Sequence, residues 1–264
     1  MTQDNSVPAR PSATVVLLRE GEQNPELLMV KRRAGDAFGD SYAFPGGVVD
    51  HDESDAHGLI DGKTAGEANA VLEVSGDGLD YYSAAIRELF EETGILLARD
   101  NKEEWASDSP QLQALRVEVD KGRVPWSAFL KTQGLRLACD ALHYFAHWET
   151  PLDQPKRWST RFFLAEMPTT QDATHDSSEV TDIRWLSASR ALAASRDGSM
   201  KLPFPTIRNL ENMSDIASME ELIEWANSKV HEGIVKLRPI RIQRSGKSKW
   251  VVWGDDGYPA DRPL

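Results

Sequence analysis

The sequence RELFEETGI at residues 87–95 decides how the rest of this chain is interpreted. On a helix, Glu88, Glu91 and Glu92 lie three and four residues apart and therefore share one side. Like charges at that spacing repel one another, and Mg²⁺ or Mn²⁺ would remove the repulsion because hard cations select carboxylate oxygens. The alternative is a solvated acidic face on which Arg87 is an ion-pair partner. Gly94 predicts the end of the helix, since glycine favours the left-handed conformation after the last turn.

A second motif lies upstream, where the sequence FPGG at residues 44–47 is followed by an acidic segment that ends at Glu53. Glycine pairs allow the backbone to approach a ligand closely. Together the two motifs resemble the Nudix box, G-x5-E-x7-R-E-U-x-E-E-x-G-U, in which U is a bulky aliphatic residue. The specified positions are filled by Gly47, Glu53, Arg87, Glu88, Leu89, Glu91, Glu92, Gly94 and Ile95.

The spacer between the two halves of the box departs from the pattern. It comprises residues 54–86, which is 33 residues where the pattern has seven, so 26 are inserted. This interrupted box resembles the Nudix subgroup that contains the mammalian peroxisomal coenzyme A diphosphatase. Residues 54–80 are acidic and aperiodic, and they predict a loop with one helical turn at 65–72. Two interpretations of the insertion stay open, a lid that selects the substrate and a structural or partner-facing addition.

The resemblance implies an α/β Nudix fold, in which a mixed β-sheet lies between α-helices. We expect this domain over residues 12–196, with 197–264 as a C-terminal helical and hairpin extension packed on the same domain. The residue pattern predicts strands at 13–18, 27–30, 142–148, 161–167 and 183–186, and helices at 81–93, 111–121, 126–131, 187–196 and 218–228. Residues 236–243 and 250–253, joined by a turn at 245–247, predict a terminal hairpin. The tail from residue 200 caps the core or builds a dimer contact.

The resemblance also implies a reaction, the hydrolysis of a diphosphate by water with Mg²⁺ or Mn²⁺ as cofactor. Glu91 and Glu92 are the expected principal metal ligands, together with the backbone carbonyl of Gly46. Glu88 is expected to be a further ligand or the general base that orients water. In the metal-free protein, the clustered charge should raise the pKa of at least one carboxylate.

Other residues are expected to complete the catalytic set around Glu88. Arg87 pairs with Glu53, which would brace the helix against the glycine turn. The resemblance implies a further acidic ligand from a loop outside the box. Glu179 is preferred over Glu149 and Glu166 because it stands just ahead of a predicted strand, where family members often supply that carboxylate. A solvated loop acid is the alternative interpretation of Glu179.

Substrate recognition is less strongly indicated by the sequence. Arg32 and Arg33 follow a predicted strand, where basic side chains could meet a diphosphate or simply be solvated. A basic and aromatic group could stack on a base and bind a phosphate, or could pack in the core. Its members are Trp148, Lys156, Arg157, Trp158 and Arg161, of which Trp158 and Arg161 are the expected substrate contacts. His143 and His147 are interpreted as structural.

A coenzyme A fingerprint of a neighbouring Nudix subgroup is broken in this chain. The fingerprint begins with two leucines, here Leu27 and Leu28, and ends with F-P-G-G. Asp40 stands at its glycine and Asp36 at its second arginine, which counts against coenzyme A.

The composition excludes several other classes of protein. A net charge of −12 and a pI of about 5.0 argue against binding to long DNA or RNA. The only cysteine, Cys139, cannot form an intramolecular disulfide and is expected to be a small buried residue. The first apolar run, residues 13–18, is too short for a signal peptide or a membrane span. The last four residues are not the Ser-Lys-Leu peroxisomal address, so the cytoplasm is expected.

The predicted function is therefore metal-dependent hydrolysis of a nucleotide-containing diphosphate metabolite, with coenzyme A or acyl-coenzyme A first. ADP-ribose or another nucleoside diphosphate derivative is the alternative substrate. A catalytically silent ligand sensor is the alternative from another class, although a sensor need not retain all the acidic residues of the box. A nucleotide diphosphate is the expected small-molecule partner, and a homodimer is an open expectation.

Overall fold

The central element of the protein is a mixed sheet. The computed structural model describes residues 7–33, 39–175, 179–244 and 246–259. The strand order is β10 (Val180–Leu186), β2 (Glu26–Arg32), β1 (Arg10–Arg19), β9 (Trp158–Glu166), β8 (His143–Glu149) and β11 (Lys236–Leu237). Two short strands also pair with strands of this sheet, β3 (Tyr42–Ala43) with β2 and β4 (Gly46–Val48) with β1. β1 is parallel to β9 and antiparallel to β2 and β4, so the predicted mixed sheet is confirmed.

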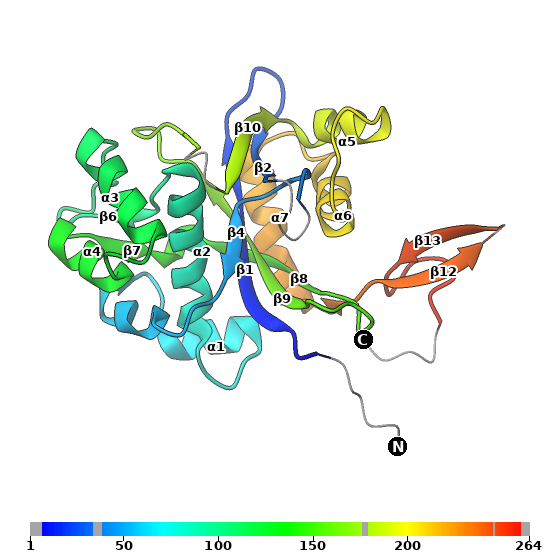
Figure 1. Ribbon diagram of the computed structural model, residues 1–264, viewed down its shortest axis with the longest axis horizontal. Helices are drawn as coiled ribbons and strands as arrows, with labels where there is room; N and C mark the ends of the chain where they lie inside the picture. Colours follow the sequence, from blue (N-terminus) through cyan, green and yellow to red (C-terminus); the bar gives the residue numbers. More distant parts are fainter. Residues whose placement is uncertain (1–6, 34–38, 176–178, 245, 260–264) are drawn as a thin grey trace.

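Helices cover both faces of this sheet, as the resemblance predicted (Figure 1). One face carries α1 (Ala65–Leu72), α2 (Gly78–Thr93), α3 (Pro110–Asp120) and α4 (Trp126–Gln133). The same side holds a small sheet of β5 (Ile60–Asp61), β7 (Arg136–Ala138) and β6 (Ala98–Arg99), and the 3-10 helices η1 (Glu53–Leu59) and η2 (Cys139–Ala141). The other face carries α5 (Ala188–Arg196), α6 (Phe204–Met213) and α7 (Met219–Glu232).

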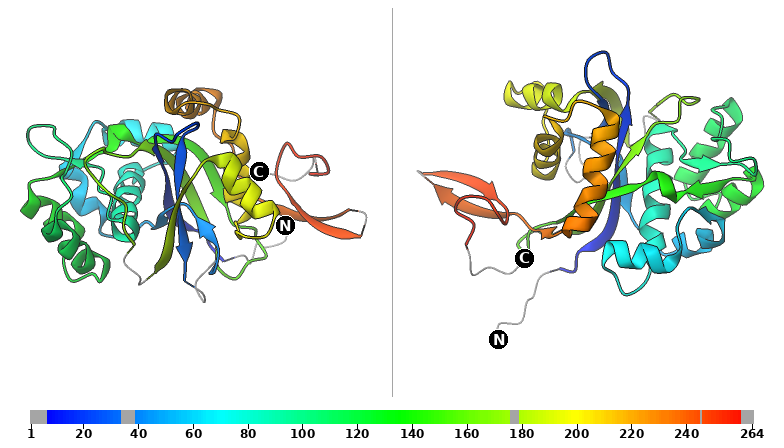
Figure 2. Two further views of the ribbon diagram at one scale, coloured as in Figure 1. Left: turned by 90° about the horizontal axis from the view of Figure 1, so that it is seen from above. Right: turned by 180° about the vertical axis from the view of Figure 1, so that it is seen from behind.

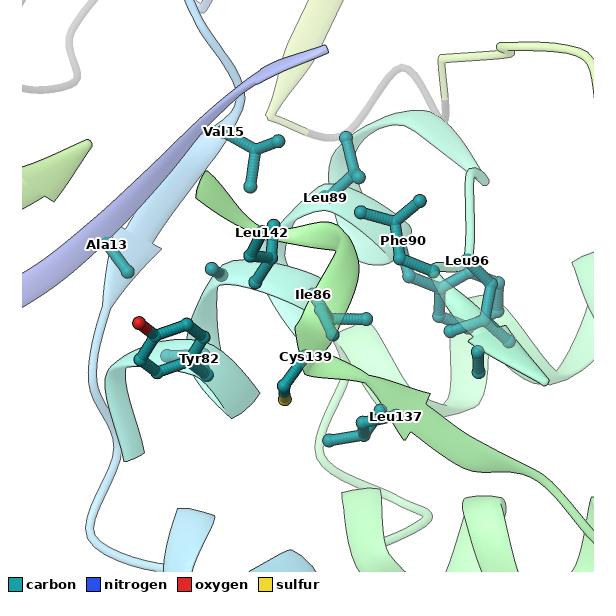
Figure 3. Packing of buried hydrophobic residues seen from close by; sticks show 14 of the residues in the cluster. Ala13, Val15, Tyr82, Ile86, Leu89, Phe90, Leu96, Leu137, Cys139 and Leu142 are labelled. Atoms are coloured by element: carbon teal, nitrogen blue, oxygen red, sulfur yellow. The ribbon is translucent and has the colours of Figure 1, made fainter. Parts of the chain in front are cut away.

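The apolar run at residues 13–18 forms a strand buried on both sides. Ala13 and Val15 point into the core against α2, whereas Val16 and Leu18 point into the core beneath α5, α6 and α7. This arrangement explains the continuous apolar sequence, because a strand between two helical layers has no polar face. Figure 3 shows Val15 near Leu89, in the core that α2 shares with β1.

The helix that carries the acidic residues, α2, starts and ends through specific contacts. Its first residue, Gly78, donates its backbone N–H to the side-chain oxygen of Asn69 at 2.8 Å, so α1 supplies a hydrogen-bond acceptor for the start of α2. Gly94 follows the helix with a φ of 76°, and its N–H donates to the carbonyl of Phe90 at 2.8 Å. The predicted helix stop at Gly94 is therefore confirmed.

The insertion in the box differs from the predicted loop. The expected helical turn is the complete helix α1, which begins with a capping box between Thr64 and Glu67. η1 and β5 precede it, and Ile60 of β5 pairs with Leu137 of β7. Buried Ala56, Ala68 and Leu72 place the insertion in the same core as α2. The sequence of the insertion did not predict these elements, because they are short and a few buried apolar residues are enough to anchor them among many acidic ones.

The C-terminal residues supply both core and projecting elements. α7 packs against β8, and β11 continues the sheet beyond β8. The predicted strand at 236–243 is interrupted at Arg238 and Pro239, after which β12 (Ile240–Arg244) and β13 (Lys247–Val251) form a hairpin that extends from the body (Figures 1 and 2). Of the predicted turn at 245–247, residue 245 lies outside the described residues. Across the part of the chain described above, no helix combines the length and apolarity needed to cross a bilayer.

Candidate active site

Two adjacent glycines bring the β4 backbone against α2. Gly46 pairs with Thr14 of β1 and has a φ of +154°, and a Cβ there would lie 2.3 Å from the carbonyl oxygen of Ala13. A Cβ on Gly47 would lie 2.4 Å from the carboxylate of Glu88. The absence of a side chain at these residues therefore permits the contact between the glycine turn and the acidic helix.

Arg87 joins the two halves of the interrupted box. Its Nε donates to Glu53 Oε1 at 2.8 Å, and its Nη2 donates to the carbonyl of Val48 at 2.9 Å. Its Nη1 donates to Glu91 Oε2 at 2.8 Å and lies 3.1 Å from Glu88 Oε1. The predicted pairing of Arg87 with Glu53 is confirmed, and it connects α2 to both η1 and the glycine turn.

Glu92 and Arg32 meet at the same turn. The N–H of Gly46 donates to Glu92 Oε2 at 3.1 Å, and Arg32 Nη2 lies 3.2 Å from Glu92 Oε1. Arg32 Nη2 also donates to the carbonyl oxygen of Gly46. A guanidinium thus provides positive charge between Glu92 and the Gly46 carbonyl, two of the groups expected to bind a metal.

Burial perturbs the carboxylates of α2. Desolvation raises the pKa of Glu91 to about 8, against the opposing effect of Arg87. It also raises the pKa of Glu92 to about 7, against the opposing effect of Arg32. Burial likewise raises the pKa of Glu88. The predicted upward shift is confirmed, although burial contributes more to it than the clustered charge, which adds to it.

The chemistry of this donor set fits a hard divalent cation. The carboxylates of Glu88, Glu91 and Glu92 and the carbonyl of Gly46 are all oxygen donors. Glu92 Oε1 is buried and accepts no hydrogen bond from the described residues. Arginines hold these side chains, and no three His, Cys, Asp or Glu side chains in the described chain converge as a preformed metal cage. A cation would compensate the raised carboxylate pKa values by stabilising the ionised forms.

Of the three candidate loop acids, Glu179 lies at this centre. It lines both of the cavities that Glu88 lines, and its charge contributes to the raised pKa of Glu88 and of Glu92. Glu149 is instead paired with Arg157, Lys236 and Arg238 at 2.9, 3.3 and 2.7 Å. Glu166 is the last residue of β9 and pairs with Leu18, four residues along the strand from Phe162, which is level with the glycine turn. The two serines beside Glu179 that were weighed in its alternative interpretation lie outside the described residues.

Two cavities meet the acidic helix. One has a volume of about 330 Å³ and is lined by acidic residues of α2 together with Asp50, Asp52 and Asp120. The other has a volume of about 830 Å³ and extends from Gly46, Gly47, Glu88 and Arg32 into an aromatic region. All of residues 54–80 are described, and none of them lines either of these two cavities, which favours the structural interpretation of the insertion.

The basic and aromatic group predicted for substrate contact divides between two faces of β9. Trp158 lines the larger cavity, together with Trp148 and Lys156. Arg161 lies on the opposite face and is buried, so the prediction that it binds substrate is not supported by its position. Its Nη1 donates to His147 Nε2 at 2.9 Å, and its guanidinium lies 4.8 Å from the ring centroid of Tyr81. Strand side chains alternate between faces, which separates residue 161 from residue 158.

Other predicted residues also have definite positions. Arg33 follows β2, is exposed, and is not among the described residues that line the two cavities, whereas its backbone N–H donates to the Glu179 carbonyl at 2.9 Å. Arg157 is buried and paired with Glu149. His143 Nδ1 is 2.8 Å from the side-chain oxygen of Asn227, in keeping with its structural interpretation. Cys139 is buried as expected, and burial raises the pKa of its thiol.

Sequence reasoning missed most of the apolar wall of the larger cavity. Phe44 adjoins the glycine turn and could have been found from that position. Phe162, Phe204 and Trp250 also line the cavity, but they come from β9, α6 and β13. Their separation along the chain leaves no local motif that indicates a shared site.

Comparison with known proteins identifies the family. The model of the NUDT19 Nudix domain matches residues 65–213. The chain is 27% identical over 194 residues to acyl-coenzyme A diphosphatase NUDT19 of Xenopus laevis, covering 68% of this chain and 51% of that protein. It is likewise 27% identical over 194 residues to the human protein of the same name, with coverage of 67% and 50%. The chain therefore spans about half the length of these curated relatives.

A solved structure supports the same fold. A Nudix hydrolase from Alicyclobacillus acidocaldarius superimposes with a TM-score of 0.69 and 24% sequence identity, covering 83% of this chain and 96% of that chain. At this identity the likeness shows the fold alone. The family match covers more than half of the chain and includes the acidic part of the box on α2. This chain belongs to the Nudix hydrolase superfamily and carries a NUDT19-type Nudix domain.

Proposed function

We propose that this protein hydrolyses the diphosphate linkage of a nucleotide-containing metabolite in a reaction that requires Mg²⁺ or Mn²⁺. The observation that carries the proposal is the convergence of Gly46, Arg32, Glu92 and Glu88 where the cavity of about 830 Å³ meets α2. The basic side chain of Arg32 can bind phosphate oxygens, while the carboxylates can hold cations beside them. The aromatic part of the cavity has room for the organic group attached to the diphosphate.

The residues of this site have distinct proposed roles. Glu91, Glu92 and the Gly46 carbonyl would hold the metal, with Glu179 as a further ligand. The bound cation would supply charge neutralisation at the phosphate and lower the pKa of a water. Glu88 would accept the proton of the attacking water or act as an additional ligand. The new P–O bond forms as the bond from that phosphorus to the bridging oxygen breaks.

Two arginines position these groups. Arg87 contacts Glu53, Glu91 and the Val48 carbonyl, so it keeps α2 in place against the glycine turn. Arg32 contacts both Glu92 and Gly46 and also lines the larger cavity. Once a metal neutralised Glu92, the Arg32 guanidinium could contact the diphosphate instead.

Coenzyme A or acyl-coenzyme A is the first proposed substrate. The Xenopus and human relatives are named acyl-coenzyme A diphosphatases, which supports this choice. Asp40 replaces the glycine of the broken coenzyme A fingerprint but has a φ of 60°, a left-handed conformation that aspartate tolerates. Asp36 lies outside the described residues. ADP-ribose is the alternative within the same reaction class.

A substrate panel tests this proposal. Coenzyme A, acetyl-coenzyme A, ADP-ribose and other nucleoside diphosphate derivatives are incubated with the full chain and Mg²⁺ or Mn²⁺, and the products are separated by chromatography. Cleavage of coenzyme A to phosphopantetheine and adenosine 3′,5′-bisphosphate, with at least tenfold preference over ADP-ribose, is the expected result. Preference for ADP-ribose would reject the coenzyme A assignment, and no turnover of any diphosphate would favour the ligand sensor.

A further inference from the structure

The larger cavity runs along one face of β9. Phe162, Thr160 and Trp158 are every second residue of this strand, so their side chains share one face, and all three line the cavity. Phe162 pairs with Thr14, which pairs with Gly46 at the glycine turn. Trp158 is four residues away from Phe162, a distance of about 13 Å along a strand. The cavity therefore extends about that far from the proposed diphosphate position.

The C-terminal hairpin lies at the distant end of this face. Leu237 of β11 pairs with Trp148 of β8, which in turn pairs with Thr160 of β9. Pro239 follows two residues later, lines the cavity and leads into β12. Among the described hairpin residues of β12 and β13, Trp250 also lines the cavity. The hairpin thus supplies an aromatic residue far in sequence from the Nudix box.

The indole of Trp250 is held at this place by its neighbours. The next residues, Val251 and Val252, are buried. Val252 donates its N–H to Asp255 Oδ2 at 3.0 Å, and Asp255 Oδ1 accepts from Arg208 of α6 at 2.8 Å. These contacts attach the base of the hairpin to the core, while β12 and β13 extend away from the body (Figure 2).

Among the described residues, one cation contacts the ring of Trp250. The guanidinium of its cross-strand partner Arg241 lies 4.6 Å from the ring centroid. Trp250 lines the cavity, whereas Arg241 is not among its described lining residues. The opposite face of the indole is therefore the one available to a ligand, and the Arg241 stack keeps the ring oriented.

We propose that Trp250 is a specificity-determining residue that stacks on the nucleobase of the substrate. This inference rests on the proposed function for the position of the diphosphate, beside Gly46 and Arg32. Trp158 and Lys156 line the same cavity as Trp250, so a flat aromatic base would meet aromatic surface and positive charge in it. A flexible chain of amides and methylenes would gain less from a planar indole, which favours the nucleoside over the other substituent of the diphosphate.

Two ligands that differ only in the base separate stacking from phosphate binding. AMP and ribose 5-phosphate share a phosphate and a ribose, and neither contains a diphosphate to hydrolyse. Their dissociation constants are measured by calorimetry with the full chain and Mg²⁺, for the native protein, Trp250→Ala, Trp250→Tyr and Trp253→Ala. Trp253 is the matched control, because it is 53% exposed and is not among the described cavity-lining residues.

The native protein should bind AMP more tightly than ribose 5-phosphate. Trp250→Ala should weaken AMP binding by at least about fivefold and leave ribose 5-phosphate binding unchanged, as loss of one stacked ring requires. Trp250→Tyr should retain most of the preference, and Trp253→Ala should retain all of it. An unchanged AMP affinity in Trp250→Ala, equal losses for both ligands, or no native preference for AMP would overturn the inference. An intact AMP preference without diphosphate hydrolysis would reject the proposed function alone.

Discussion

At the residue scale, the two glycines of the turn lack side chains for different reasons. A Cβ on Gly46 would meet the backbone of Ala13 and Thr14, at 2.3 Å from a carbonyl oxygen and 2.6 Å from a Cα. A Cβ on Gly47 would meet the end of the flexible Glu88 side chain. The first contact involves the sheet, and the second involves a proposed catalytic group.

Alanine substitutions should therefore separate stability from activity. Gly46→Ala should lower the melting temperature markedly, because the β1–β4 pairing must shift to admit the methyl group. Gly47→Ala should lower it little, since Glu88 can rotate, but should reduce kcat at least tenfold by displacing that carboxylate. Thermal unfolding and initial rates are measured on both variants. Equal losses of stability in the two variants would contradict this distinction.

Glu179 gives a second prediction at this scale. Glu179→Gln should lower kcat by roughly tenfold or more, because the amide retains the size of the side chain and loses its charge. Glu166→Gln is the matched control, as Glu166 is an exposed acid at the last position of β9 and is not among the described residues that line the two cavities. Steady-state kinetics with Mg²⁺ compare the two variants, and native turnover in Glu179→Gln would remove that residue from the site.

At the element scale, the β8–β9 pair contains a buried polar contact that should respond to acid. Burial, with neighbouring Arg161 and Lys236, lowers the pKa of His147 to about 3. The unfolded chain binds a proton at this histidine below about pH 6.5, while the folded chain does not. Folded-state stability should therefore fall as the pH falls from about 6.5 towards 3, by at most ~1.4 kcal/mol per pH unit from this group.

Denaturant unfolding between pH 7 and pH 4 checks this prediction. His147→Gln removes the titrating group and leaves a side-chain oxygen that can accept from Arg161. The free energy of unfolding of this variant should vary less with pH than that of the native protein. Identical pH dependence in the two proteins would contradict this prediction, because it would mean that His147 has the same pKa in the folded and unfolded chain.

The same elements show what sequence could and could not predict. Runs such as residues 13–18 identified strands because strands buried on both faces are continuously apolar. Arg161 precedes the run Phe162–Ala165, which is apolar on both faces and gives no alternation from which to assign side-chain direction, so its position on the face opposite Trp158 was not predicted. α6 was missed because Pro203 and Pro205 indicate a loop, although proline is suited to the first turn of a helix.

The site itself was predictable where its residues are close in sequence. Arg87, Glu88, Glu91 and Glu92 are within two turns of α2, and the resemblance to the Nudix box placed the glycine turn beside them. The pairing of Glu92 with Arg32 depends on how β2 and β4 lie against α2, which the sequence does not specify. Trp250 could not be predicted as a site residue because only the fold of the C-terminal residues brings it to the cavity that Trp158 also lines.

At the scale of the whole molecule, the insertion acts as part of the core of the domain. Leu72 is 1% exposed and packs in the cluster that includes α2. Leu72→Ala should therefore reduce the free energy of unfolding by ~2–5 kcal/mol. The KM of this variant should equal that of the native protein at temperatures where the variant is folded, because residues 54–80 do not line the two cavities. A large rise in KM would support the lid interpretation instead.

The central claim is that two motifs separated by 33 residues form one metal-dependent hydrolytic site. Arg87 connects them, because it contacts Glu53 and the Val48 carbonyl in the upstream motif and the Glu91 carboxylate on α2. Glu118 on α3 provides a matched control, since it is paired with Arg123 at 2.6 Å near the surface. Both acids can be changed to glutamine with little change in size.

The most direct measurement is the initial rate of coenzyme A hydrolysis as Mg²⁺ is titrated from zero to saturation. The native protein and Glu118→Gln should show the same metal-dependent rate, with none in excess chelator. Glu91→Gln should be slower by ~100-fold or more at saturating Mg²⁺ while retaining the native fold by circular dichroism. Hydrolysis that proceeds without metal, or at the native rate in Glu91→Gln, would contradict the proposed site.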